Sequence, residues 1–139
     1  MNKSEIEAAL SKTAFTGSWA GTIRDPGGDF RNVASSTVFR DEQFGNVRCI
    51  GQSGHDETWQ ALQVMLAPGT PDGRYVVGDG HLLQMAYIAP GQSDVEIAVA
   101  GAVSFSRGKE VLYTLRVQDF LSGNGTQIDC NLIIEGELE

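Results

Sequence analysis

Hydrophobic and polar side chains alternate along most of this chain with a period of two residues, the pattern of a strand that buries one face. Segments rich in Gly, Pro, Asn, Asp and Ser separate the alternating stretches and are typical of turns. We therefore predict about eight strands, at 19–24, 33–40, 46–51, 59–66, 82–88, 95–105, 110–120 and 127–138. Because the connections are short and closure removes exposed sheet edges, the pattern predicts an all-β fold, an antiparallel up-and-down barrel that spans 1–139 as one domain.

The N-terminal segment has a different pattern. Ser4 is followed three residues later by Glu7, and Ala8, Ala9 and Leu10 come next. This arrangement is typical of a capping box, in which two side chains satisfy backbone N–H groups at the start of a helix. One short helix is therefore expected before the first strand, and it should end near residue 12.

Two of the predicted strands have unusual faces. In 95–105 the bulky side chains alternate with small ones, so Ile97, Val99 and Val103 are expected on the same face. In 82–88 both faces are mostly apolar, with Gln84 as the polar exception. A strand of this kind is covered on both sides, either by a second subunit in a homodimer or by a loop of the same chain.

The composition narrows the choice of partners. The 139 residues (14.9 kDa, 41% hydrophobic) suit one domain, and ten basic against eighteen acidic side chains give a net charge of −8. That charge repels phosphate backbones and anionic lipid headgroups, so we expect no nucleic-acid or membrane partner. The chain starts without the apolar core of a secretory signal, and a cytoplasmic location is expected. Cys49 and Cys130 lie in apolar runs and are expected to be buried thiols.

A short motif opens the first strand. Gly17, Ser18 and Trp19 form a Gly-x-Trp sequence that resembles the signature of the calycin barrels, which include lipocalins, fatty-acid-binding proteins and avidins. The segment 107–112, Arg-Gly-Lys-Glu-Val-Leu, is similar to a late hairpin of avidins. The resemblance implies that Gly17 lets the chain turn into the barrel floor, that Trp19 fills the closed end, and that Arg116 packs on Trp19.

A barrel of this kind is expected to bind a small, mostly apolar molecule in its interior. Of Gln60, Gln63 and Gln84, at least one should point inward, because Gln60 and Gln63 differ by an odd number of positions, and an inward amide needs a partner. The candidate ligand-binding residues are aromatic, thioether and amide side chains on the strands: Trp59, Met65, Gln84, Met85, Tyr87 and Tyr113.

His81 supports two interpretations. It follows Gly78, Asp79 and Gly80, so Asp79 either caps a turn or orients the imidazole. In the second case His81 would be a general acid or base, with Tyr87 or Tyr113 as a phenolic hydrogen-bond donor, in an enzyme that cyclises or isomerises a small hydrophobic substrate. Haem ligation is a further role that a barrel of this size allows to His81.

Other chemistry has little support in the sequence. His55 lies in a polar turn and is expected to be a solvated loop residue. No nucleophile elbow, phosphate-binding loop, zinc pattern or dinucleotide fingerprint is present, so we expect no metal and no cofactor. A third interpretation, besides binder and enzyme, is a non-catalytic protein whose acidic surface associates with a basic partner.

Overall fold

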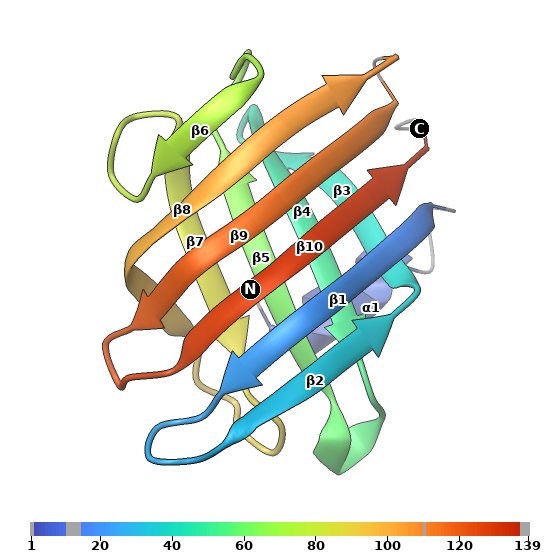
Figure 1. Ribbon diagram of the computed structural model, residues 1–139. Helices are drawn as coiled ribbons and strands as arrows, with labels where there is room; N and C mark the ends of the chain where they lie inside the picture. The colour runs from blue at the N-terminus through green and yellow to red at the C-terminus, as the bar shows by residue number, and fades with distance from the viewer. Residues whose placement is uncertain (1, 11–14, 110, 137–139) are drawn as a thin grey trace.

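The computed structural model describes residues 2–10, 15–109 and 111–136 as a nearly closed antiparallel β-barrel (Figure 1). The strands form one sheet in the order β2-β1-β10-β9-β8-β7-β5-β4-β3, with β6 beside β8. This order confirms the predicted all-β, up-and-down barrel. The elements are α1 (Lys3–Leu10), β1 (Thr16–Arg24), β2 (Phe30–Ser35), β3 (Thr37–Gln43), β4 (Asn46–Ser53), the 3-10 helix η1 (Asp56–Thr58), β5 (Gln60–Leu66), β6 (Gly73–Val76), β7 (Leu82–Ile88), β8 (Glu96–Gly108), β9 (Leu112–Ser122) and β10 (Gln127–Glu135).

The strand count exceeds the predicted eight for two reasons. The strand expected at 33–40 is divided at Ser36 into β2, which pairs with β1, and β3, which pairs with β4. The additional strand β6 comes from a segment rich in turn residues and pairs with β8 beyond the point where β7 stops pairing with it. In both cases one stretch of chain pairs with one strand along part of its length and with a different strand along the rest.

The sheet closes along a seam between its two ends, β2 and β3, and the strands that face them. Among the described residues, β2 forms a ladder with β1 alone and β3 with β4 alone. Side chains join the remaining edges: Ser35 Oγ donates to Gln52 O, Arg31 Nη1 to Gln60 Oε1 (2.8 Å) and Arg40 Nη2 to Gly136 O (2.7 Å). The seam is therefore held by a few side-chain hydrogen bonds instead of a continuous backbone ladder.

The interior of the barrel is filled by apolar side chains from both walls. Trp19 on β1 is fully buried, and its ring lies against Gly51 on β4, where a Cβ atom would come within 2.7 Å of the indole. Gly17 has a positive φ of 151°, and a Cβ there would meet the Ile133 carbonyl oxygen at 1.8 Å. Gly17 thus allows β1 and β10 to approach closely, and Gly51 makes room for Trp19.

The helix α1 covers part of the outer surface of the barrel. Ile6 packs there with Phe39, Ile50, Trp59 and Ile88, which form a second hydrophobic cluster outside the main core. The side chain of Asn2 accepts a hydrogen bond from the Glu5 N–H (2.9 Å), so Asn2 caps the helix and α1 begins at Lys3. The cap therefore lies two residues before the predicted cap at Ser4. No helix in the described part of the chain is long and apolar enough to cross a membrane.

Two irregularities in β8 change which side chains face the core. The register with β9 shifts between Ala98 and Ala100 and again between Ala100 and Ala102. As a result, Ala98 and Val103 belong to the core, while Ile97 and Val99 are exposed. The expectation that Ile97, Val99 and Val103 share a face is therefore wrong: the first shift adds one residue to β8, which reverses its alternation once, whereas the second shift adds one residue to β9.

Candidate ligand site at the barrel mouth

One end of the barrel, which we call the mouth, is formed by the ends of β1, β7 and β9 and the loops that follow them (Figure 1). A cavity of about 650 Å³ opens there. It is lined by Asp25, Pro26, Arg31, Ala89, Pro90, Gln92, Glu96 and Asn124. The lining combines a charged group on each side with an apolar strip of proline and alanine, a combination suited to a small ligand that has one polar end.

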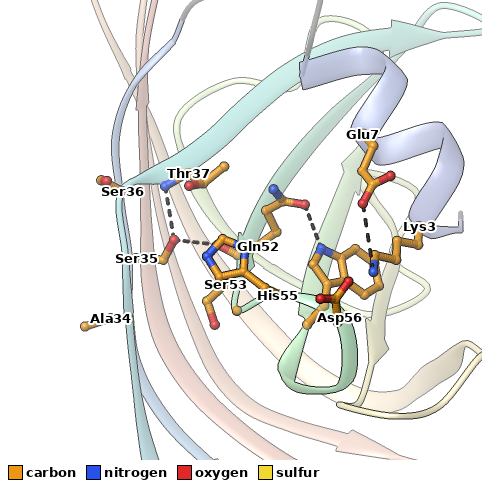
Figure 2. A pocket seen from close by; sticks show the side chains of 12 residues that line it. Lys3, Glu7, Ala34, Ser35, Ser36, Thr37, Gln52, Ser53, His55 and Asp56 are labelled. Atoms are coloured by element: carbon orange, nitrogen blue, oxygen red, sulfur yellow. Dashed lines mark hydrogen bonds and ion pairs between the residues drawn. The ribbon is translucent and has the colours of Figure 1, made fainter.

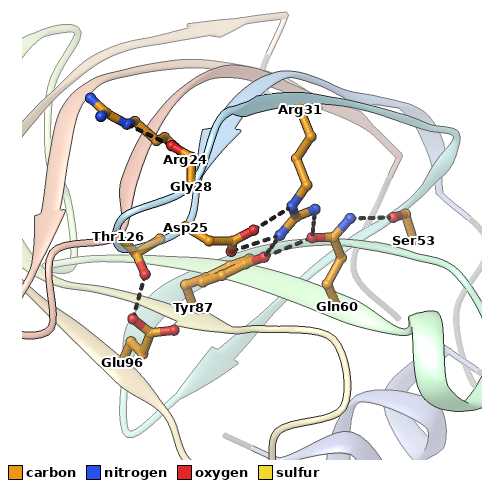
Figure 3. A network of polar contacts seen from close by, with 9 residues as sticks. All are labelled: Arg24, Asp25, Gly28, Arg31, Ser53, Gln60, Tyr87, Glu96 and Thr126. Atoms are coloured by element: carbon orange, nitrogen blue, oxygen red, sulfur yellow. Dashed lines mark hydrogen bonds and ion pairs between the residues drawn. The ribbon is translucent and has the colours of Figure 1, made fainter.

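Arg31 is the central polar residue of the mouth. It lies near the start of β2 and points inward, where its Nε donates to Asp25 Oδ2 at 2.9 Å (Figure 3). Its Nη1 donates to Gln60 Oε1 at 2.8 Å and its Nη2 to the Tyr87 hydroxyl at 2.6 Å. The bond to Asp25 raises the pKa of Arg31 above its ordinary value. The guanidinium is thus held in one orientation by side chains from two other strands and a loop.

Gln60 and Tyr87 support Arg31 from below. The Tyr87 hydroxyl donates to Gln60 Oε1 (2.7 Å), and Gln60 Nε2 donates to Ser53 Oγ (3.1 Å). Tyr87 is fully buried, and this burial raises its pKa to about 12, although the neighbouring Arg31 opposes the shift. Tyr87 is therefore a neutral hydrogen-bond donor over the physiological pH range.

A second polar group faces Arg31 across the mouth. Glu96, at the start of β8, accepts hydrogen bonds at Oε1 from Ser122 Oγ (2.9 Å) and Thr126 Oγ1 (2.6 Å). Its other oxygen accepts none from a described residue, and Glu96 lines the cavity. Two nearly buried hydroxyls therefore fix the carboxylate and leave one oxygen available at the cavity surface; Figure 3 shows the contact with Thr126.

The electrostatics of the mouth favour donors in a ligand. Asp25 and Glu96 carry negative charge and Arg31 carries positive charge, so these three lining groups have a net charge of −1. The whole chain, with a net charge of −8, adds to the negative potential. A cation or an N–H donor can meet the carboxylates, whereas an anion would be repelled by them.

The structure brings only part of the predicted ligand-binding set into the barrel. Tyr87 and Met85 point into the core, and Tyr113 does so at the opposite end from the mouth. The other three predicted residues lie instead on the outer face: Trp59, Met65 and Gln84. On β5 the inward positions are taken by Gln60, Leu62 and Val64, so Trp59 and Met65 face outward. On β7 they are taken by Met85 and Tyr87, so Gln84, which is paired with Met65, faces outward as well. The expectation that one glutamine points inward is confirmed for Gln60, whose partners are protein side chains.

Trp59 belongs to a separate pocket on the flank of the barrel (Figure 2). This pocket of about 600 Å³ lies between α1, η1 and the junction of β2 and β3. The Trp59 Nε1 donates to Gln52 Oε1 (2.8 Å), and Lys3 Nζ lies 5.6 Å from the ring centre and 3.9 Å from Glu7. The indole is therefore occupied by contacts within the chain. His55 is exposed in η1's flanking turn, as expected.

His81 lies far from Tyr87. The Asp79 carboxylate accepts hydrogen bonds from the backbone N–H groups of Val76, His81 and Leu82 at 2.8–3.0 Å, which is the capped turn that was one of the two interpretations. These bonds, led by that from Leu82, lower the pKa of Asp79. The His81 ring is exposed and packs against Tyr75. Six residues of strand separate His81 from Tyr87, roughly 20 Å at ~3.3 Å per residue, so the two form no catalytic pair here.

Arg116 does not cover Trp19. Its neighbours Leu115 and Val117 point into the core, so Arg116 is exposed on the outer face. Arg40 is instead the arginine at the closed end of the barrel, where it lies 4.3 Å from the Tyr113 ring centre and is 4% exposed. Gly17 permits the close approach of β1 and β10, and Trp19 is fully buried.

Both cysteines are buried and free. Burial raises the pKa of the Cys49 and Cys130 thiols to about 12. In the described ranges, no group of three or more His, Cys, Asp or Glu side chains is arranged to hold a metal ion. The raised pKa keeps both thiols protonated and therefore weakly nucleophilic at neutral pH.

Comparisons with known proteins give no match to a protein-family model, a curated protein or a solved structure. The barrel is compatible with a calycin-like fold, and the likeness to calycins remains one of architecture and of the Gly-x-Trp motif. The cavity-lining residues Asp25, Arg31 and Glu96 escape sequence reasoning, because a turn and the start of a strand are ordinary places for charged residues. The one available signal is the odd spacing of Gln60 and Gln63.

Proposed function

We propose that this protein binds a small molecule at the barrel mouth, with a cationic or N–H-donating group against Glu96 and Asp25 and an apolar part against Pro26, Ala89 and Pro90. The observation that carries the proposal is the Glu96 carboxylate, fixed by two nearly buried hydroxyls, with its second oxygen at a cavity of about 650 Å³. A carboxylate held in place before binding loses little freedom when it meets a donor.

The position of the cavity changes the expected mode of binding. The interior below the mouth is occupied by buried side chains such as Ile23, Leu62 and Phe120. The ligand would therefore rest in the mouth, above Tyr87, instead of lying along the barrel axis. Its apolar part would contact the rim, and its polar end would be selected by the carboxylates.

Benzamidine is a suitable probe, because it joins a flat apolar ring to a bidentate cation, and benzoate is its anionic counterpart. We expect benzamidine to bind and benzoate to fail in calorimetric titrations. Glu96→Gln should weaken benzamidine binding by about tenfold, through the loss of a charge-assisted hydrogen bond. Glu135→Gln is the matched control, since Glu135 is exposed at the other end of the barrel. Equal binding of the two probes, or no loss in Glu96→Gln, would contradict the proposal.

The alternative of an enzyme that cyclises or isomerises a substrate receives less support from the geometry. It depends on His81 acting with Tyr87 or Tyr113. His81 directly precedes β7 and is exposed, whereas Tyr87 lies near the other end of that strand and Tyr113 is packed in the core. Tyr87 itself is fully buried beneath Arg31 and does not line the cavity. We therefore assign Tyr87 the role of positioning Arg31.

A further inference from the structure

The outer face of β8 and β6 carries an apolar surface on the flank of the barrel. Val99 is 66% exposed, Val76 47% and Ile97 44%. Between Glu96 and Arg107, β8 contains no charged residue, in a chain of which 20% is charged. Exposed strand faces without charge are uncommon in monomers, because they invite association.

The surface is centred on a groove of about 390 Å³. Its apolar floor is formed by Val76, Val77, Val99 and the small residues 100–102, and two residues of opposite charge, Arg74 and Asp119, complete the lining. Neither charge has an ion-pair partner in the described part of the chain. The groove therefore combines an uncharged centre with one positive and one negative side chain.

We propose that this groove is the contact surface of a homodimer formed by two copies of the chain around a two-fold axis. In such an interface, residue i of one copy meets residue j of the other, and j meets i in turn. A surface with one positive and one negative side chain flanking an apolar centre is complementary to itself under that rotation. Arg74 of each copy pairs with Asp119 of the other, and the exposed faces of Val76 and Val99 become buried.

The charge of the chain argues against most other occupants. A basic partner would be drawn to the acidic regions of the surface, and this groove carries no net charge because Arg74 and Asp119 cancel. The two copies, each with a net charge of −8, repel one another over longer distances, so a neutral surface is where they can meet.

Sedimentation velocity over a range of concentrations tests the proposal. The wild-type chain should sediment as a dimer at about 100 µM, and Val99→Lys should sediment as a monomer at the same concentration. Phe44→Lys is the matched control, because Phe44 is 96% exposed at the β3–β4 turn, away from the groove, and this variant should remain dimeric. A monomeric wild type, or a dimeric Val99→Lys, would overturn the proposal.

Charge reversal gives a second test that does not depend on hydrophobic substitutions. Arg74→Asp should weaken the dimer at least about tenfold, and the double variant Arg74→Asp with Asp119→Arg should restore it. Failure of the double variant to regain affinity while its circular dichroism matches the wild type would refute the pairing of these residues. Ligand binding at the mouth involves neither residue, so the outcome is independent of the proposed function.

Discussion

The two arginines inside the barrel lie in opposite settings. At the mouth, Arg31 donates to a carboxylate, an amide and a phenol, and it lines an open cavity. At the closed end, Arg40 is almost fully buried, donates to the Gly136 carbonyl, and lies over the rings of Tyr113 and Phe15. Among the described residues, its Nε has no hydrogen-bond partner.

The comparison shows how one residue type serves two purposes in one fold. Water can replace the partners of Arg31, because that network borders a cavity, so its bonds contribute mainly orientation. Water cannot easily replace the contacts of Arg40, so the closed end depends on them for stability. We therefore expect substitutions at the closed end to affect unfolding and those at the mouth to affect binding.

Trp19→Ala should have the largest effect, because this fully buried indole fills the interior between the two ends. We expect the free energy of unfolding to fall by about 3–5 kcal/mol. Urea denaturation followed by circular dichroism measures the loss. Phe44→Ala, at a position that is 96% exposed, should change it by less than about 0.5 kcal/mol. A loss below 1 kcal/mol in Trp19→Ala would contradict the filled interior.

Arg40→Ala should destabilise the protein by about 2–3 kcal/mol, through the loss of packing on Tyr113 and an unpaired Gly136 carbonyl. The same urea titration checks it. Benzamidine binding by the folded fraction should be unchanged, because the mouth lies at the other end. A variant that unfolds normally but binds more weakly would show that the two ends are coupled.

Arg31→Ala should affect ligand binding more than stability, the reverse of Arg40→Ala. Because Gln60 and Tyr87 keep their mutual hydrogen bond, we expect a loss of only about 1 kcal/mol in unfolding free energy. Removal of the cation leaves Asp25 unpaired beside Glu96 and makes the mouth more negative. Benzamidine, a cation, should therefore bind several-fold more tightly, as measured by calorimetry. If Arg31→Ala destabilises more than Arg40→Ala, the distinction between the two ends fails.

Tyr87→Phe should have the smallest effect at neutral pH, about 0.5–1.5 kcal/mol. The pKa of Tyr87 is raised to about 12 from its ordinary value of 10.0, so the unfolded chain ionises first. The corresponding stability is present below pH 10 and is lost as the pH rises from 10 toward 12. The unfolding free energy of wild type should therefore fall more steeply over that window than that of Tyr87→Phe, and parallel curves would contradict the raised pKa.

Much of the fold follows from periodicity. The alternation predicts the barrel and its strands because each strand has one buried face, and spacing alone predicts that Gln60 or Gln63 points inward. The bulges in β8 are not predictable in this way: both Ala98 and Ala100 fit either side of a strand, and the choice depends on pairing with β9. That local choice determines whether Ile97 and Val99 are core residues or surface residues.

The site was harder to predict than the fold. Tyr87 could be selected as an aromatic residue in an apolar strand, but Asp25, Arg31 and Glu96 come from three different segments that meet only in the closed barrel. Trp59 is misplaced by sequence reasoning because α1 turns part of the outer surface into a second buried region. Side-chain periodicity shows that a face is buried but does not identify what covers it.

The seam between β2 and β4 gives the barrel one direction in which it can widen. Elsewhere, moving two strands apart breaks a row of backbone hydrogen bonds that depend on one another. At the seam, Ser35 and Arg31 can each rotate about their own side-chain bonds and release their acceptors separately. Breathing of the molecule should therefore concentrate along this line, beside the mouth, where amide hydrogens of β2 would exchange with solvent earliest among the strands.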